Sequence, residues 1–385
     1  MNNWKKVKLS DIGTIVTGNT PSTSNPENYS SNDINFFKPS DFSNESVNIL
    51  KKSEYYISDF ARENAKILPP NSVLVTCIGT IGKVGINTEY SSFNQQINAI
   101  IPKNGVIESK YLAYSIHKKN KEINSIANAP VVPIINKSQF SNIQITLPPL
   151  EEQRRIAETL DLASSLIEKR KKQIELLDTL AKSLFIDMFG DPVENPMGWE
   201  MFELSQIGKW NSGGTPSRYN PENFKGNINW YSAGELNSLF LDQSNEKITQ
   251  NGLENSAAKL FPKGSLLIGM YDTAAFKMGI LKDSASSNQA CANVIPKESI
   301  NVIWLYYNLD SMKTDFLKKR RGVRQKNLNL GMIKGFSIPI PPKHFQNKFA
   351  ERIESIEARK SDLQKGLEKL EMNYKALMQM YFEEA

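Results

Sequence analysis

The fold follows from a short segment, Gly18-Asn19-Thr20-Pro21-Ser22, that returns as Gly213-Gly214-Thr215-Pro216-Ser217. Working outward, Trp4-x4-Leu9-x2-Ile12-Gly13 precedes the first copy, and Trp199-x4-Leu204-x2-Ile207-Gly208 precedes the second. Downstream, Asn94-Gln95 returns as Asn288-Gln289 and Lys83-x-Gly85-Ile86 as Lys277-x-Gly279-Ile280. A period of about 193 residues is too long for a solenoid repeat, so each copy is expected to be a whole domain with a connector.

The connectors are expected to be long helices. Each begins after a proline pair, Pro148-Pro149 or Pro341-Pro342, and proline favours the first turn of a helix. Apolar residues then follow alternating spacings of three and four, the pattern of a coiled-coil seam. They are Ile156, Leu160, Ala163, Ile167, Ile174, Leu177, Ala181, Leu184 and Met188, and then Phe349, Ile353, Ile356, Leu363, Leu367, Leu370, Tyr374, Leu377 and Tyr381.

Arg170 and Lys360 interrupt these two series. They either fix the register and reach acidic neighbours, or they extend into solvent, which is the interpretation we favour from sequence. A single apolar stripe left bare would expose a large strip, so the two helices are expected to pack on each other, antiparallel if the halves are related by a pseudo-two-fold axis. The alternative is that each helix pairs with another chain.

The predicted fold class is α+β, with two tandem α/β domains that are each followed by a long helix. Buried strands are expected at residues 72–78, 97–101, 266–270 and 293–295, and short helices at residues 110–117 and 302–309. The predicted boundaries are a first domain at 1–147, its helix at 148–189, a linker at 190–198, a second domain at 199–340 and its helix at 341–385.

Composition favours a cytoplasmic chain. No apolar run is long enough to span a membrane, no secretory signal is visible, and Cys77 and Cys291 do not occupy equivalent places in the repeat. The two helical segments each carry a net charge of −1, so the rest of the chain carries a net charge of +8 within the total of +6, and a polyanion is expected to bind there. A mildly basic protein without such a partner is the alternative.

No catalytic or metal-binding motif is found. The two histidines, His117 and His344, have no Cys or His at ligand spacing, and neither a phosphate-binding Gly-Lys-Thr/Ser loop nor a dinucleotide motif follows a strand. The glycine loop Gly79-Thr80-Ile81-Gly82 has no glycine-rich counterpart in the second copy. We therefore predict no catalytic residue, no metal and no cofactor in this chain.

The repeated motifs resemble those of the DNA specificity subunits of type I restriction-modification systems. The resemblance rests on the Trp-x4-Leu-x2-Ile-Gly opening, the Gly-x-Thr-Pro-Ser segment, the Asn-Gln pair and the run Pro-Pro-Leu-Glu-Glu-Gln-Arg-Arg-Ile-Ala at residues 148–157. It covers nearly the whole chain. One departure is Lys343-His344-Phe345-Gln346, which keeps only the glutamine of that run, so the two helix starts need not contact partners alike.

The resemblance implies a non-catalytic protein with two target recognition domains, each of which reads half of a split site on double-stranded DNA, while the coiled coil sets the gap. It also implies two modification subunits, which carry the adenine methyltransferase and its S-adenosylmethionine, and in some systems restriction subunits. Two other functions stay open: a restriction enzyme with an unrecognised site, and a coiled-coil scaffold that binds protein only.

Paired donors and acceptors suit base edges, and cations suit phosphates. The DNA-contact candidates are Thr20, Ser22, Lys38, Ser40, Lys83, Asn94, Gln95 and Gln96 in the first domain, and Thr215, Ser217, Arg218, Tyr231, Lys277, Asn288 and Gln289 in the second. The basic run at residues 318–326 adds Arg320, Arg321 and Arg324. Partner-contact candidates are Glu151, Glu152, Gln153, Arg154, Arg155 and Gln346.

Each group has a structural alternative. The Thr-Pro-Ser segment is also typical of a turn, and the Asn-Gln pair can satisfy buried backbone groups. Because two domains that read different sequences need not share base-reading residues, the repetition of the pair favours the structural role. A solvated loop is the alternative for the basic run.

Overall fold

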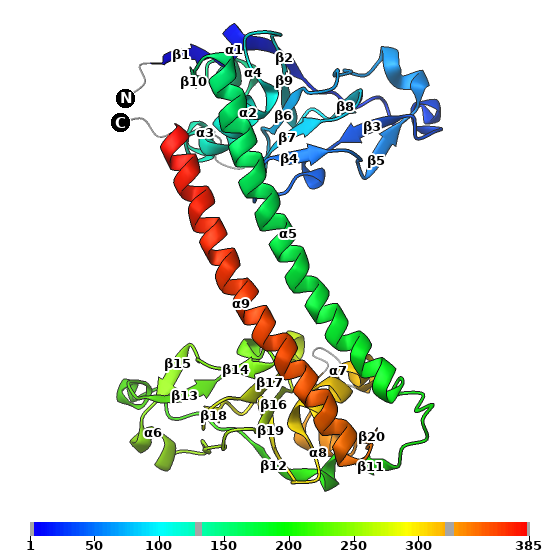
Figure 1. Ribbon diagram of the computed structural model, residues 1–385, viewed down its shortest axis with the longest axis vertical. Coiled ribbons are helices and arrows are strands. Elements are labelled where there is room, and N and C mark those ends of the chain that lie inside the picture. Colours follow the sequence, from blue (N-terminus) through cyan, green and yellow to red (C-terminus); the bar gives the residue numbers. More distant parts are fainter. Residues whose placement is uncertain (1–3, 128–132, 320–326, 383–385) are drawn as a thin grey trace. The chain divides into compact units, whose positions relative to one another are not determined.

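The computed structural model describes residues 4–127, 133–319 and 327–382. The chain folds into two compact units, Met1–Lys171 with Lys365–Ala385, and Lys172–Gln364. Each unit contains one mixed α/β domain together with one half of each long helix, α5 (Leu150–Phe189) and α9 (Lys343–Phe382) (Figure 1). The predicted fold class, two tandem α/β domains with two long helices, is confirmed.

In the first unit, two sheets of five and three strands carry the domain. The five-stranded sheet has the order β2-β9-β6-β7-β4 and the smaller one the order β5-β3-β8, while β1 pairs with β10. The elements are β1 (Lys5–Lys8), α1 (Leu9–Ile12), β2 (Gly13–Thr17), η1 (Pro26–Tyr29), β3 (Ile34–Phe37), η2 (Pro39–Asp41), β4 (Asn48–Leu50), β5 (Tyr55–Ile57), η3 (Asp59–Glu63), β6 (Val73–Thr76), β7 (Val84–Asn87), β8 (Ser91–Phe93), β9 (Ile97–Pro102), α2 (Ser109–Lys118), α3 (Asn120–Ile126), α4 (Lys137–Ser141) and β10 (Gln144–Leu147).

The second unit repeats this topology. Its sheets have the orders β12-β19-β16-β17-β14 and β15-β13-β18, and β11 pairs with β20. The elements are β11 (Met201–Glu203), η4 (Leu204–Gln206), β12 (Gly208–Ser212), η5 (Pro221–Phe224), β13 (Ile228–Tyr231), η6 (Ala233–Glu235), β14 (Phe240–Leu241), β15 (Glu246–Ile248), α6 (Gln250–Glu254), β16 (Leu266–Gly269), η7 (Asp272–Ala274), β17 (Met278–Leu281), β18 (Ser286–Ser287), β19 (Cys291–Pro296), α7 (Val302–Lys318), α8 (Leu330–Lys334) and β20 (Ser337–Pro339).

The central strands explain the core of each domain. Every residue of β6 and of β16 is buried, because each strand lies between two others and is covered on both faces. Helices α2 and α7 pack beside these strands with fully buried rings such as Tyr111 and Trp304. The four predicted strands are present with shifts of one or two residues at their ends, whereas α7 extends well beyond the predicted 302–309.

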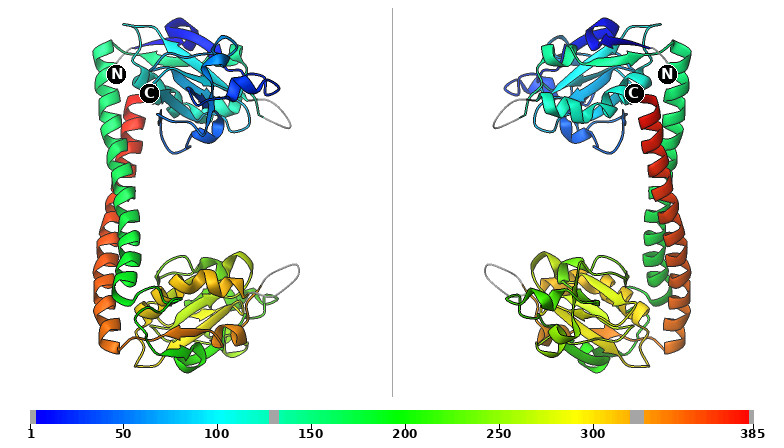
Figure 2. Two further views of the ribbon diagram at one scale, coloured as in Figure 1. Left: turned by 90° about the vertical axis from the view of Figure 1, so that its right-hand side faces the viewer. Right: turned by 90° about the vertical axis from the view of Figure 1, so that its left-hand side faces the viewer.

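The long helices pair antiparallel in each unit (Figures 1 and 2). In the first unit, the Arg155 guanidinium lies 5.6 Å from the Tyr381 ring, and Lys171 pairs with Glu371 at 3.5 Å. Residue numbers therefore rise along α5 in the direction in which they fall along α9, so the two helices are antiparallel. In the second unit, Lys360 pairs with Asp178 and the Phe185 ring packs 5.6 Å from Phe349. All predicted seam positions are buried or half-buried.

Lys360 sits in this seam rather than in solvent. Its ammonium pairs with Asp178 at 2.6 Å and with Glu357 at 3.1 Å. Burial disfavours the charge, but these carboxylates outweigh it and raise the pKa of Lys360. The expectation that Lys360 is solvated is therefore wrong, and its alternative, contact with acidic neighbours, holds.

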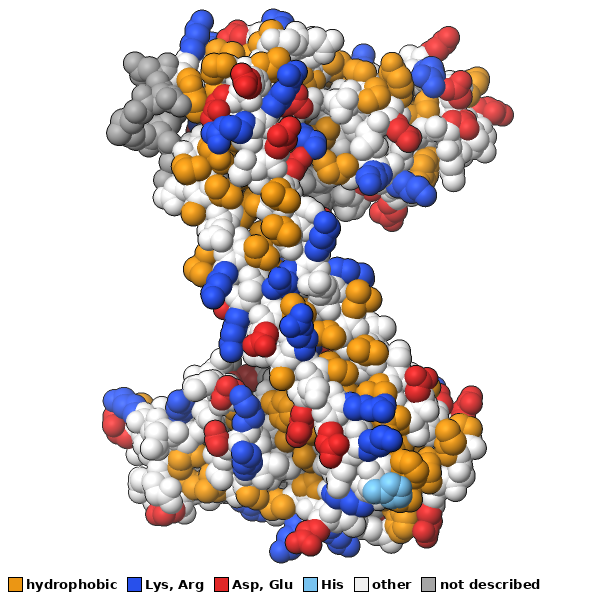
Figure 3. Space-filling model, viewed as in Figure 1, with side chains coloured by type: hydrophobic (Ala, Val, Ile, Leu, Met, Phe, Trp, Pro, Cys, Tyr) orange, Lys and Arg blue, Asp and Glu red, His pale blue; other side chains and the backbone are white. Residues whose placement is uncertain are grey.

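The outward face of the helices mixes charged and apolar side chains (Figure 3). In the first unit, Leu162 and Leu166 of α5 are exposed, and in the second unit Leu176 and Leu180 of the same helix are exposed. These four residues lie outside the seam. Within the described residues, no helix combines the length and the apolar character that crossing a membrane requires.

Candidate nucleic-acid interface

The loops of the first domain that carry candidate residues meet at one edge of its sheets. β2 ends where β9 begins, with Thr17 opposite Asn98, and β6 ends with Thr76 opposite Ile97. The parallel strands β3 and β8 end side by side, with Phe37 opposite Phe93. The loops after β2, β3, β6 and β8 therefore lie together, and we call this place the recognition edge.

Hydrogen bonds between loops hold the recognition edge of the first domain. The Thr20 hydroxyl donates to Gln95 Oε1 at 2.6 Å, which ties the Thr-Pro-Ser loop to the loop after β8. The backbone amide of Asn94 donates to the backbone carbonyl of Phe37 at 3.1 Å. The backbone amide of Cys77 donates to the Gln96 carbonyl at 2.7 Å, which adds the loop after β6.

Two lysines of the edge have internal roles. The Lys83 ammonium donates to the carbonyls of Pro39 and Phe42, at 3.2 and 2.7 Å, and so braces the loop after β3. The Lys38 ammonium lies 3.1 Å from the centre of the Tyr55 ring, a cation–π contact. Lys38 is half-buried against this ring, whereas the Lys83 ammonium donates to the protein's own carbonyls.

The second domain builds the same edge from its own residues. The Thr215 hydroxyl donates to Gln289 Oε1, the Asn288 amide donates to the Tyr231 carbonyl at 2.9 Å, and the Met270 amide donates to the Ala290 carbonyl at 2.9 Å. The Lys277 ammonium lies 3.4 Å from the Gly234 carbonyl. Both copies of the Thr-Pro-Ser segment and of the Asn-Gln pair thus join the same two loops.

Arg218 is a cation of the second edge that was predicted to contact DNA. Its guanidinium forms a two-pronged ion pair with Glu246, at 2.9 and 2.8 Å, and lies 4.5 Å from the Phe224 ring. The hydrogen bonds that Arg218 donates to the Glu246 carboxylate raise the pKa of Arg218. The two guanidinium nitrogens that could donate to a guanine or a phosphate therefore donate to the Glu246 carboxylate in this structure.

Several residues that were predicted to contact DNA are instead buried or bonded within the protein. The Tyr231 side chain is only 2% exposed in the core under the edge, and burial raises its pKa to about 12. Asn94 is buried, and its amide group donates to Gln96 Oε1 while its Oδ1 accepts from the Gln96 backbone. Asn288 Oδ1 likewise accepts from the Ala290 amide. The repeated asparagine therefore stabilises a turn.

Gln153 and Gln346 are also corrected. The Gln153 side chain is 1% exposed; its amide donates to the carbonyls of Pro148 and Val106, and its Oε1 accepts from the Glu108 backbone. Gln346 makes the equivalent three bonds to Pro341, Ser299 and Asn301. Each glutamine fixes the start of a long helix to its own domain, so neither can contact a partner.

The other predicted partner residues lie on the surface of α5. Glu151, Arg154 and Arg155 are exposed, and Glu152 pairs with Arg155 one turn later. The hydrogen bonds from Arg155 hold the pKa of Glu152 below its usual range. These four residues remain candidates for a partner contact.

The remaining DNA-contact candidates differ in accessibility. Ser22, Ser40 and Gln95 are exposed at the first edge, and Ser217 and Gln289 at the second. Arg320, Arg321 and Arg324 lie outside the described residues. Lys319 directly follows α7 and precedes these arginines, and its ammonium lies 5.2 Å from the centre of the Phe336 ring.

Sequence reasoning missed Tyr219. This ring directly follows Arg218 in the Thr-Pro-Ser loop and is fully exposed, although large aromatic side chains usually bury most of their surface. Its counterpart in the first copy is Ser24. The signal that could have found Tyr219 is this difference between two otherwise similar loops.

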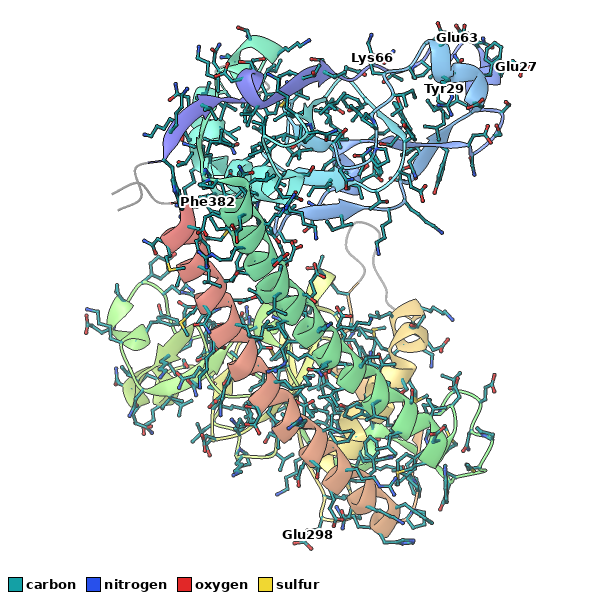
Figure 4. The ribbon with its side chains drawn as sticks, turned by 45° about the horizontal axis from the view of Figure 1, so that its top comes forward. Glu27, Tyr29, Glu63, Lys66, Glu298 and Phe382 are labelled. Carbon is teal, nitrogen blue, oxygen red and sulfur yellow. The ribbon has the colours of Figure 1, made fainter. Side chains whose placement is uncertain are left out.

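The outer tip of the first domain is acidic. Figure 4 shows Glu27, Tyr29 and Glu63 at the end of the domain that is remote from Phe382 of α9, with Lys66 nearby. Tyr29 donates its hydroxyl to the Pro21 carbonyl at 2.7 Å, and Ser58 joins the two short helices of the tip through the Asn28 carbonyl. Carboxylates repel phosphates, so the tip is a poor place for DNA.

Metal and thiol chemistry find no support in the described part of the chain. It contains no group of three or more His, Cys, Asp or Glu side chains that could hold a metal ion. Burial raises the pKa of the Cys77 thiol to about 11 and that of Cys291 to about 12, so both stay protonated at neutral pH.

The chain is similar to a defined protein family along nearly its whole length. The family model described as "Type I restriction modification DNA specificity domain" matches residues 1–176 and again residues 196–372. The type I restriction enzyme MjaIX specificity subunit of Methanocaldococcus jannaschii is 26% identical, over 92% of this chain and 86% of its own. The MjaVIII specificity subunit of the same organism is 28% identical, over 72% of this chain and 70% of its own.

A solved structure shares the fold. The crystal structure of the S subunit of a type I restriction-modification system from M. genitalium superposes with a TM-score of 0.64 at 15% identity, over 100% of this chain and 98% of that one. At such low identity the likeness shows the fold alone.

Proposed function

The chain belongs to the type I restriction-modification DNA specificity family, and on this premise we propose that its two domains each read one half of a bipartite DNA site. It is a non-catalytic recognition subunit. We further propose that α5 and α9 set the gap between the half-sites and dock two modification subunits, which would hold the S-adenosylmethionine.

The observation that carries the proposal is the duplicated recognition edge. Thr20 with Gln95, and Thr215 with Gln289, join equivalent loops in the two domains, while exposed neighbours such as Ser24 and Tyr219 differ. A scaffold that is kept while its exposed side chains vary is what two readers of different sequences require.

The helices support a role in assembly. The seam between α5 and α9 is buried, yet Leu162 and Leu166 remain exposed on the α5 segment of the first unit. Leu162 and Leu166 lie one helical turn apart on the same face, so together they form a small apolar patch that a partner could cover. We therefore assign the modification subunits to the outward face of α5, including Glu151, Glu152, Arg154 and Arg155.

Mapping of methylated adenines tests the proposal. The chain would be expressed with and without its neighbouring modification subunit in a host that lacks adenine methylation. We expect methylation at one two-part motif with an indifferent centre, and only when both proteins are present. Methylation by the modification subunit alone, or at an uninterrupted motif, would contradict the proposal.

A loop variant separates the two readers. Arg218→Thr with Tyr219→Ser gives the second loop the residues of the first copy, Thr23 and Ser24, and removes the exposed ring and the cation from the second edge. We expect the methylated motif to change or relax in one half only. The control, Lys5→Ala on β1 of the first domain, alters an exposed cation that is not among the DNA-contact candidates and should leave both halves of the motif unaltered.

A further inference from the structure

A groove in the first unit is not explained by half-site reading. It has a volume of about 1730 Å³ and lies between the segment Asp41–Lys52 and the helices α2, α3, α5 and α9. All of its lining residues belong to the first unit.

The groove is lined by more cations than its carboxylates neutralise. Glu45 and Glu371 both pair with Lys171, at 2.7 and 3.5 Å, and Asp41 accepts backbone bonds from Lys38 and Glu54. The other lining lysines include four that no ion pair among the described residues reaches: Lys51, Lys52, Lys121 and Lys375. Glu168 is the fourth carboxylate of the lining, so six lysines lie against four carboxylates and the lining carries a net charge of +2.

The wall of the groove is continuous with the recognition edge. The segment Asp41–Lys52 follows directly on Lys38 and Ser40, and Lys83 of the edge binds the carbonyls of Pro39 and Phe42. The Lys171–Glu45 pair fixes the other side of the same segment to α5. The segment Asp41–Lys52 therefore connects the recognition edge to the positive groove.

The second domain has the opposite charge at this position. Ser53 and Ser244 occupy equivalent places, because each donates its hydroxyl to the asparagine of the neighbouring strand, Asn35 or Asn229. The two residues before them are Lys51-Lys52 in the first copy and Asp242-Gln243 in the second. Asp242 is already paired with Lys282 at 3.1 Å. At these two positions the basic charge is present only in the first domain.

We propose that this groove binds the phosphate backbone of the DNA beside the half-site that the first domain reads, without reading its sequence. The inference rests on the proposed function and extends it. A polyanion fits because lysine ammonium groups neutralise phosphates one by one. The second domain lacks this contact and instead has the basic run at residues 318–326, which has no charged counterpart in the first copy.

The test uses the full chain assembled with its modification subunits. Affinity for two duplexes, one with the mapped methylation site and one with that site scrambled, is measured as a function of salt concentration. Lys51→Ala with Lys52→Ala is compared with Lys5→Ala and Lys8→Ala, which alter exposed lysines on β1, outside the groove. Unfolding midpoints confirm that both variants fold.

We expect the groove variant to bind both duplexes more weakly by a similar factor. The slope of log affinity against log salt should become less negative by about 1 to 2, since each phosphate contact contributes about 0.9. The β1 control should match the wild type. The reverse exchange, Asp242→Lys with Gln243→Lys, should make the slope steeper.

Three results would overturn the inference. An unchanged slope would show that phosphates do not enter the groove. A loss confined to the duplex with the intact site would mean that the groove reads bases. Failure to assemble with the modification subunits, with DNA binding intact, would assign the groove to an acidic protein surface. Failure of the proposed function is distinct, because the wild type would then not distinguish the two duplexes.

Discussion

At the scale of single residues, Phe276 shows how the second recognition edge departs from the first. Its backbone is left-handed, with φ of 58°, at the position where the first domain has Gly82 with φ of 85°. Such a conformation costs a bulky residue about 1 to 3 kcal/mol. The ring is buried 5.3 Å from Phe316 and 6.2 Å from Phe336, and this packing holds the strained backbone in place.

We predict that Phe276→Gly is more stable than Phe276→Ala by about 1 kcal/mol. Both variants lose the ring, which costs about 3 to 5 kcal/mol, but only glycine relieves the left-handed backbone. At an ordinary position alanine would be the more stable of the two. Urea unfolding of the full chain measures the difference. Equal stability, or an advantage for alanine, would show that Phe276 is not strained.

Which residues gather at the edge could be predicted from the sequence, but their exposure could not. Thr20 and Gln95 are distant in the chain, but the repeat singled out both, and the structure joins them by a hydrogen bond. Tyr231 and Gln153 were misjudged because strand register and helix docking decide whether a polar side chain faces inward. Repetition of Gln153 as Gln346 reflected an internal bond rather than a contact surface.

At the scale of the elements, the helices were the most predictable part. The heptad pattern identified the seam because apolar residues that recur at this spacing lie on one face of a helix and are buried there. The sharing of each helix between two units was not visible, since heptads do not say which stretch of a partner they meet. Nor did the pattern explain why Gly366, a poor helix former, sits within α9.

Gly366 makes room for Arg170 across the seam. A Cβ atom at Gly366 would lie 2.2 Å from Arg170 Nη1. Gly366→Ala should therefore be nearly neutral in the wild type, because the gain of about 1 kcal/mol in helix propensity is offset by displacement of the guanidinium. In an Arg170→Ala background the same change should stabilise by about 1 kcal/mol. Thermal unfolding of the four proteins gives the coupling, and identical effects in both backgrounds would exclude it.

At the scale of the whole molecule, neither copy of the repeat completes a unit by itself. The first unit needs the second half of α9, which supplies Met378 to its core, and the second unit needs the second half of α5, which supplies Phe185 and Phe189. The units divide at Lys171 in α5 and at Gln364 in α9, which are equivalent positions of the repeat. Both helices must therefore change together if the pairing in each unit is to survive.

This symmetry makes the proposed ruler testable. We predict that seven residues inserted after Lys171 and seven after Gln364 lengthen the gap in the methylated motif while both half-sites stay the same. A heptad preserves the seam and adds about 10 Å to a helix, which corresponds to about three base pairs of DNA. Methylated adenines mapped in cells would show the new spacing.

The single insertions are the control for this prediction. Seven residues added to α5 alone shift it against α9, so at least one unit loses contacts such as Lys360 with Asp178 or Arg155 with Tyr381. Those variants should lose stability and activity. If the double insertion instead kept the original spacing, the helices would not measure the gap, and the distance between half-sites would have to be set by the partner subunits.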